Sequence, residues 1–133
     1  PAKVDVAEET RGQSEVGARF YEGAAAGAIL LGRAPTVPAF ANEFNWNEAV
    51  VDVPPTADGV QAVLDRFSAD PTLAKQLGRR NALEAVRRFD WSHRWQEILE
   101  IAGLEPVSQL AERVTRLNAL AESARIGTDS DCS

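Results

Sequence analysis

Cysteine and histidine are almost absent from this sequence. The only thiol, Cys132, lies in the polar stretch 128–133, and His93 is the only histidine. One cysteine excludes an intrachain disulfide and a metal site built from several thiolates. No group of histidine, cysteine and carboxylate residues has the spacing of metal ligands, so we expect no metal and no other cofactor.

Long apolar runs are missing as well. No run approaches the roughly 20 residues that cross a bilayer, so we expect no membrane span. Residues 1–14 are polar and acidic, and they lack the apolar centre of a secretory signal peptide. We therefore expect a cytoplasmic protein, with a flexible N-terminal segment at residues 1–14 and a disordered tail at residues 127–133.

Basic charge is limited. The 14 lysines and arginines face 20 aspartates and glutamates, which leaves a net charge of -6. Nucleic-acid-binding proteins usually present a basic face, so we expect no nucleic-acid partner. Only Lys3 and Lys75 are lysines, and this preference for arginine is typical of a GC-rich bacterial gene.

The spacing of apolar residues predicts five helices. Thr56, Asp70 and Ser92 are suitable N-caps for three of them, because their side chains can accept hydrogen bonds from free backbone amides. Gly27 and Gly103 are expected to end the first and the fourth helix. The expected helices cover residues 18–26, 59–67, 71–88, 92–101 and 107–120.

The last expected helix carries an apolar stripe at steps of three and four residues. Such a stripe needs a partner surface, so we consider a homo-oligomer formed through this helix. The stripe consists of Val107, Leu110, Val114, Leu117 and Leu120.

Two short apolar runs predict strands. Residues 28–31 are bounded by glycines, and residues 49–53 are stopped by Pro54. Continuous runs of this kind suit strands buried on both faces of a parallel sheet. The proline-containing stretch between them, residues 35–47, is expected to be a loop.

The expected fold class is α/β. A chain of 133 residues holds one domain, and two strands are too few for a stable parallel sheet covered by helices. We therefore expect the C-terminal part of a Rossmann-like domain at residues 15–104, helix-rich with few parallel strands, and a C-terminal helix at residues 105–126. The other strands would lie upstream; pairing with another chain, or a mainly helical unit, are the alternatives.

The segment Ser14–Gly27 resembles the donor-site motif of GT-B glycosyltransferases of the group 1 type. The family motif reads Glu, two residues, Gly, four mostly apolar residues, Glu, and a small-residue stretch that closes on Gly before a strand. Anchoring on Glu22 aligns Gly17 with the family glycine and Gly27 with the closing glycine. Ser14 then stands where the family has its first glutamate, so the match is partial.

Two later segments extend the resemblance over residues 14–99. Asp70–Leu73 and Phe89–Trp95 are similar to the starts of the paired helices that close the same GT-B domain. The resemblance implies a bacterial enzyme part that binds a nucleotide sugar while a missing N-terminal domain, or another upstream part of the protein, brings the acceptor. We expect little catalysis by this chain alone.

The expected donor site is the start of the first helix. Free amides and a partial positive charge at Gly17 and Ala18 suit a diphosphate, and Arg19 can add a charge-assisted contact. By the resemblance, Glu22 accepts hydrogen bonds from ribose hydroxyls. Ser14, or Glu15 one position later, is a candidate contact to the donor sugar.

Plainer interpretations of the same residues stay open. Glu22 is also consistent with a solvated helix glutamate, Arg19 with a surface ion pair, and Gly17 with a turn glycine. His93 suits a packed or capping residue better than a catalytic base. The alternative function is a non-catalytic interaction module or dimerisation domain, built on the last helix.

Two tryptophans lie close together near the start of the fourth expected helix. Trp91 and Trp95 flank the single histidine, at the start of the helix expected at residues 92–101. Large aromatic side chains usually contribute most when they are buried. We therefore expect both tryptophans to be core anchors that dock the last helices.

Overall fold

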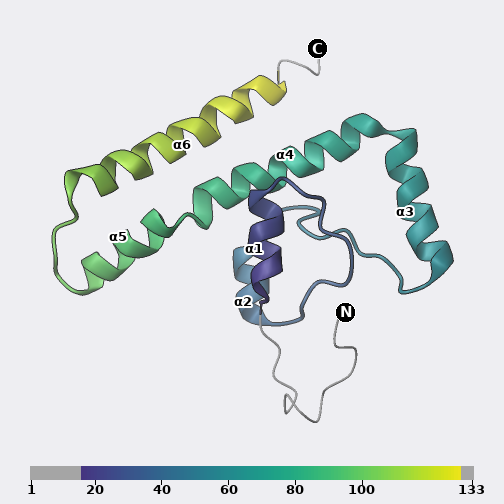
Figure 1. Ribbon diagram of the computed structural model, residues 1–133, viewed down its shortest axis with the longest axis horizontal. Coiled ribbons are helices and arrows are strands. Elements are labelled where there is room, and N and C mark those ends of the chain that lie inside the picture. Colours follow the sequence, from purple (N-terminus) through teal and green to yellow (C-terminus); the bar gives the residue numbers. More distant parts are fainter. Residues whose placement is uncertain (1–15, 130–133) are drawn as a thin grey trace, which may run out of the picture.

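A computed structural model describes the backbone of residues 16–129 and the side chains of residues 16–123. Within this part of the chain, helices account for most of the regular structure (Figure 1), which agrees with the expected helix-rich character. The helices are α1 (Ala18–Ala25), α2 (Pro38–Glu43), α3 (Ala57–Ala69), α4 (Pro71–Arg88), α5 (Trp91–Ile101) and α6 (Ser108–Asp129).

The two expected strands do not form as strands within residues 16–129. Leu31 and Val51 instead make an isolated parallel bridge. The amide of Gly32 donates to the Val51 carbonyl at 3.0 Å, and the Val51 amide donates to the Leu30 carbonyl at 2.8 Å. The parallel direction is the expected one. Two short segments without further neighbours do not build a ladder, so the described fold contains no sheet.

Side-chain caps fix the starts of α3 and α4 as expected. Thr56 Oγ1 accepts a hydrogen bond from the Gly59 amide at 3.1 Å, so α3 begins directly after this residue. Asp70 accepts from the amides of Thr72 and Leu73 at 3.1 and 3.0 Å. Pro71 occupies the first helical position of α4, where its missing amide hydrogen costs no intrahelical bond.

The expected cap of α5 is wrong by two residues. Asp90, not Ser92, is the N-cap, and its carboxylate accepts from the Ser92 amide at 2.9 Å and from the Ser92 hydroxyl at 2.6 Å. A carboxylate at the positive end of a helix is favoured by the free amides and by the helix dipole. Ser92 is therefore a buried residue of the first turn.

Helix α2 lies where a loop was expected. Pro38 occupies its first turn, and Phe40 is buried within it. Six residues are too few to show a helical period in the sequence, so this helix depends on packing. Its C-cap residue, Phe44, is buried as well and lies beneath α4 with the rest of the core.

An aromatic cluster forms the core next to α1 and α4. The rings of Phe40 and Phe44 stack with centroids 4.7 Å apart, and Phe20 meets the Phe40 ring edge-on at 5.1 Å. Offset and edge-to-face arrangements of this kind add stability beyond the area that they bury. The other aromatic members of the cluster are Tyr21, Trp46 and Phe89.

Two glycines let the end of α1 cross α4 closely. A Cβ atom on Gly78 would lie 2.4 Å from the Gly27 carbonyl oxygen, so no larger residue fits without a shift of the backbone. Gly27 also has a φ of +69°, which favours glycine. Glycine is therefore favoured at position 27 by its positive φ and by the close approach of Gly78.

Asn81 is the most deeply buried polar residue of α4, with 1% of its surface exposed. Its amide nitrogen donates to the Ala28 carbonyl at 2.8 Å, and its oxygen accepts from Trp46 Nε1 at 2.8 Å. Both polar groups of one side chain are therefore satisfied. This residue connects α4 to the segment after α1 and to the loop after α2.

Helix α6 runs alongside α5 and α4 (Figure 1), so the middle of its apolar stripe has a partner within the same chain, whereas Val107 and Leu120 at the ends of the stripe are 64% and 56% exposed. Ala121 is buried, whereas Leu110, Val114 and Leu117 are half-buried. Arg113 fixes the helix by contacting both oxygens of Asp90, at 2.6 and 3.1 Å. Assembly through α6 remains a prediction.

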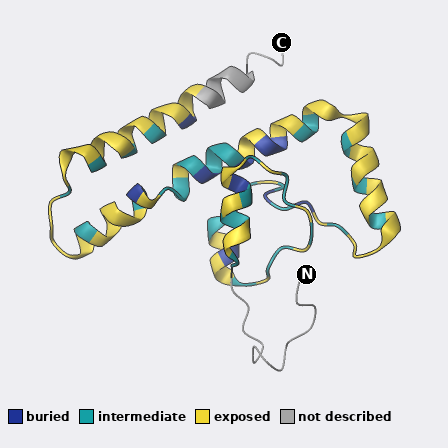
Figure 2. Cartoon of the chain, viewed as in Figure 1, coloured by how far each residue is buried: buried dark blue, intermediate teal, exposed yellow. Residues whose placement is uncertain are grey.

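The tryptophans of α5 are not core anchors, which corrects the expectation from the sequence. Trp91 is 74% exposed and Trp95 is 53% exposed. Because Ser92 and His93 turn inward, the face that carries the tryptophans and Ile98 points to solvent. Figure 2 shows several buried residues along α4 and single buried residues in the elements packed against it, with mostly exposed residues along α3 and α5.

Candidate functional site

The start of α1 presents free backbone amides. Gly17 is its N-cap, with extended backbone geometry and no side-chain cap. A Cβ atom built on Gly17 would meet no described atom within 4 Å, so the approach to the helix end is open. The first amides of a helix have no intrahelical partner, and such free amides can bind an anion. Within the described residues, the amides of Ala18 and Arg19 have no acceptor, whereas the Phe20 amide donates to the Gly17 carbonyl at 3.1 Å.

Arg19 and Glu22 lie on the same side of α1, three residues apart. Both side chains and Ala18 are exposed, whereas Phe20 and Ala24 pack into the core on the other side. Among the described residues, neither charged group has an ion pair or side-chain hydrogen bond. The structure therefore places Ala18, Arg19 and Glu22 on the exposed side of α1, with the half-exposed Gly17 at the start of the helix.

Glu22 borders a hollow of about 280 Å³ between α1, the last turn of α4 and the start of α5. The hollow is mostly apolar, with the Glu22 and Asp90 carboxylates and the Tyr21 ring at its border. The remaining lining residues are Ala25, Ala85, Val86 and Phe89.

A hydrogen-bonded group beside this hollow ties three helices together. The Tyr21 hydroxyl donates to Glu43 at the end of α2, and the other Glu43 oxygen lies 3.3 Å from an Arg94 nitrogen on α5. Burial, reinforced by the carboxylate of Glu43, raises the pKa of Tyr21 to about 12. Tyr21 is therefore a protonated donor at neutral pH. Glu43 and Arg94 gave no signal in the sequence, because their partners lie on other helices.

Asp90 is not a free base. The hydrogen bond from Arg113 holds the pKa of Asp90 well below its usual range, and the bonds from Ser92 act in the same direction against the effect of burial. Its carboxylate is already used by the cap of α5 and by Arg113. Sequence reasoning missed this residue, although Asp immediately before the helix was a visible N-cap signal.

His93 has the packed position that its plainer interpretation suggested. The ring is half-buried, and Nε2 lies 3.2 Å from the Val86 carbonyl oxygen. A carbonyl can only accept, so a proton on Nε2 completes this hydrogen bond. The contact joins α5 to α4 rather than aiming the ring at the open face of α1.

Ser14 and Glu15, the candidate contacts to a donor sugar, lie outside the residues that the structure describes. The described part holds no group of three or more histidine, cysteine or acidic residues placed to bind a metal ion. No helix in residues 16–129 combines the length and apolar character needed to cross a membrane.

The family of the chain follows from comparison with known proteins. Residues 4–100, which include α1 to α4 and most of α5, match the family described as glycosyl transferase-like. The chain belongs to this family, as the resemblance of its motifs had indicated. No curated protein and no solved structure matches the sequence significantly.

Proposed function

We propose that this chain is the donor-binding part of a glycosyltransferase of the GT-B type and that it holds a nucleotide sugar at the start of α1. Membership of the glycosyl transferase-like family supports a transferase role. The proposal assigns the diphosphate to the amides after Gly17 and to Arg19, and the ribose hydroxyls to Glu22. A further part of the protein supplies the acceptor and completes a Rossmann-like sheet.

One observation carries the proposed position of the donor. Arg19 and Glu22 are exposed within the first turns after Gly17, and neither charged side chain is engaged by a described residue. A guanidinium and free helix amides complement a diphosphate, and a carboxylate can accept from two vicinal hydroxyls. The side chains of Arg19 and Glu22 are thus available for binding and are not used in packing.

Thermal unfolding of the chain with UDP or GDP tests this assignment. Either nucleotide should raise the melting temperature at millimolar concentration, because a ligand that binds only the folded state stabilises it. Glu22→Ala and Arg19→Ala should each reduce the shift. The matched control is Glu112→Ala, an exposed glutamate on α6 that should leave the shift unchanged. Absence of a shift with both nucleotides would contradict the proposal.

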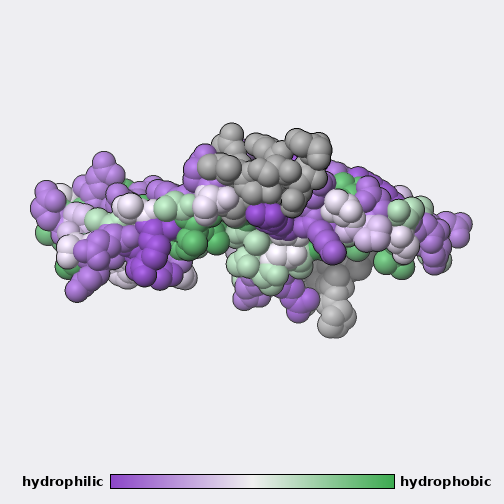
Figure 3. All heavy atoms as spheres, turned by 90° about the horizontal axis from the view of Figure 1, so that it is seen from above, coloured by the Kyte–Doolittle hydropathy of each residue, from purple (hydrophilic) through white to green (hydrophobic). Residues whose placement is uncertain are grey.

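The second candidate function is a non-catalytic interaction module. The exposed apolar face of α5 favours it, because Trp91, Trp95 and Ile98 lie at helical spacing and are each about half or more exposed. Figure 3 shows hydrophobic side chains reaching one face of the molecule in separate patches between hydrophilic ones. Sedimentation of the chain and of Trp95→Glu distinguishes the candidates: self-association that the substitution removes, without nucleotide binding, favours this second function.

A further inference from the structure

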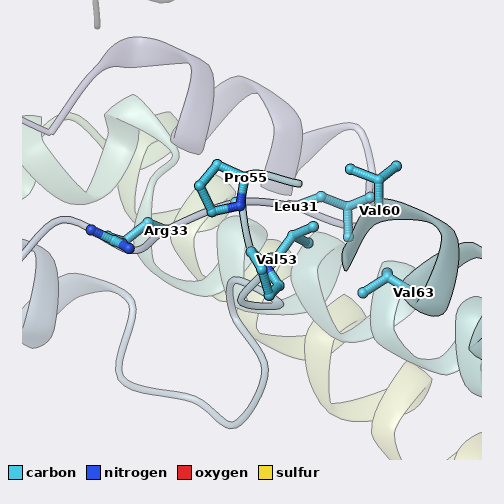
Figure 4. Close-up of a pocket in the computed structure, with 8 residues that line it drawn as sticks. Leu31, Arg33, Val53, Pro55, Val60 and Val63 are labelled. Carbon is cyan, nitrogen blue, oxygen red and sulfur yellow. The ribbon is translucent and has the colours of Figure 1, made fainter. Parts of the chain in front are cut away.

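A second, larger hollow lies away from the open surface of α1. It is an open hollow with a volume of about 570 Å³, bordered by α3 and by the segments after the Leu31–Val51 bridge (Figure 4). None of its lining residues belongs to the proposed donor site. They are Leu31, Gly32, Arg33, Val53, Pro54, Pro55, Val60 and Val63.

Specific contacts hold the walls of this hollow in place. Gly59 lies so close to Pro54 that a Cβ atom on it would be 2.7 Å from the Pro54 carbonyl oxygen. Farther along α3, Arg66 makes an ion pair with Glu48 at 2.8 Å. Helix α3 therefore packs closely on Pro54 near its start and is joined by an ion pair to Glu48 nearer its end.

The lining of the hollow changes in character from one end to the other. Figure 4 shows Leu31, Val60 and Val63 close together at one end and Arg33 at the opposite end, with the Arg33 side chain extending outward from the other labelled residues. Leu31 is 49% exposed and Val60 is 46% exposed, so apolar surface faces the opening. Arg33 is the only charged lining residue, and it has no ion pair or hydrogen bond within the described residues.

We propose that this hollow binds a small amphipathic anion. An apolar chain or ring would lie against Leu31, Val60 and Val63, and a phosphate or carboxylate group would pair with Arg33. The volume lies in the range of small-molecule sites, which are mostly apolar with a few placed polar groups. Because the whole chain carries a charge of -6, attraction of an anion here depends on this local cation.

The walls of the hollow come from backbone that the bridge holds together. Lining residues follow both Leu31 and Val51 along the chain, and the bridge hydrogen bonds fix these two segments relative to each other. The inference goes beyond donor binding and does not rest on it, since the two sites share no residue.

Calorimetric titration of the 133-residue chain tests the proposal with octyl phosphate, octanoate, 1-octanol and inorganic phosphate. At least one alkyl anion should bind about tenfold more tightly than both octanol and inorganic phosphate, since tenfold corresponds to one modest charged contact. The tighter of the two anions identifies the preferred head group. Arg33→Gln should remove the advantage over octanol, and Val63→Glu should abolish binding of the alkyl anions.

Matched variants separate this site from other surfaces. Arg116→Gln, on an exposed arginine of α6, and Trp95→Glu, in the other exposed apolar region, should not alter binding. Glu22→Ala should also have no effect, so this result is independent of the proposed donor site. Failure of both alkyl anions to bind, equal binding of inorganic phosphate or octanol, or full binding by Arg33→Gln would overturn the proposal.

Discussion

The middle of α4 and the helices at its two ends differ in how they are stabilised. Leu77, Gly78, Asn81 and Ala85 are all buried in α4, and Ala85 belongs to the same buried cluster as Ala24 of α1 and the rings of Phe40 and Phe44. Helix α3 has no buried residue, and α5 buries only Ser92. Stability is thus concentrated where the family motif folds, while α3 and α5 leave apolar side chains exposed. Substitutions of the exposed apolar side chains of α3 and α5 should therefore cost less stability than substitutions in the cluster beside α4.

The largest test of this comparison replaces one aromatic residue in each region. Phe44→Ala should lower the free energy of unfolding by about 4 kcal/mol, because it empties the centre of the aromatic cluster. Trp95→Ala should lower it by less than about 1 kcal/mol, because most of this side chain already faces solvent. Urea unfolding of both variants measures the difference, and equal losses would show that the two regions are stabilised alike.

The next effect concerns the buried amide of α4. Asn81→Ala should cost about 2 kcal/mol or more, because Trp46 Nε1 and the Ala28 carbonyl each lose a partner in a partly buried place. The matched control is Asn118→Ala on the exposed side of α6, which should change stability by less than about 0.5 kcal/mol. A small loss at residue 81 would mean that water replaces both bonds.

The contrast between the regions also explains what the sequence could predict. Helices α1, α3, α4 and α5 were predicted within a few residues, because their periods and most of their caps are local signals. The family followed from the order of motifs, and the donor site at Gly17, Arg19 and Glu22 stays a prediction. Asn81 and the Tyr21–Glu43–Arg94 group could not be found, since their partners are far away in the chain. Burial of the tryptophans was predicted wrongly because residue type does not determine which face of α5 turns inward.

Acid should weaken the contact between α5 and α6. The pKa of Asp90 is depressed in the folded state, mainly by the hydrogen bond from Arg113. The stabilisation is therefore complete above the unfolded pKa of about 4 and is lost as pH falls below it. Arg113→Gln should flatten the fall of stability in this acid range, measured by urea unfolding at several pH values. Arg116→Gln, one turn along α6, should leave the pH dependence as it is.

The smallest expected effect is a shift in the alkaline titration of Tyr21, which lies on the side of α1 that packs into the core. Tyr21 is the only tyrosine, so the tyrosinate absorbance of the chain follows this one group. Its folded pKa, about 12, is raised above the usual value near 10, so its stabilisation is present below about pH 10 and is lost as pH rises towards 12. Glu43→Gln should shift the titration to lower pH, because the carboxylate no longer opposes the tyrosinate charge. Glu97→Gln removes a carboxylate 3.5 Å from the same Arg94 but leaves Glu43 in place, and it should leave the titration nearly unchanged. Equal shifts in both variants would place the cause in general surface charge instead of the Tyr21–Glu43 bond.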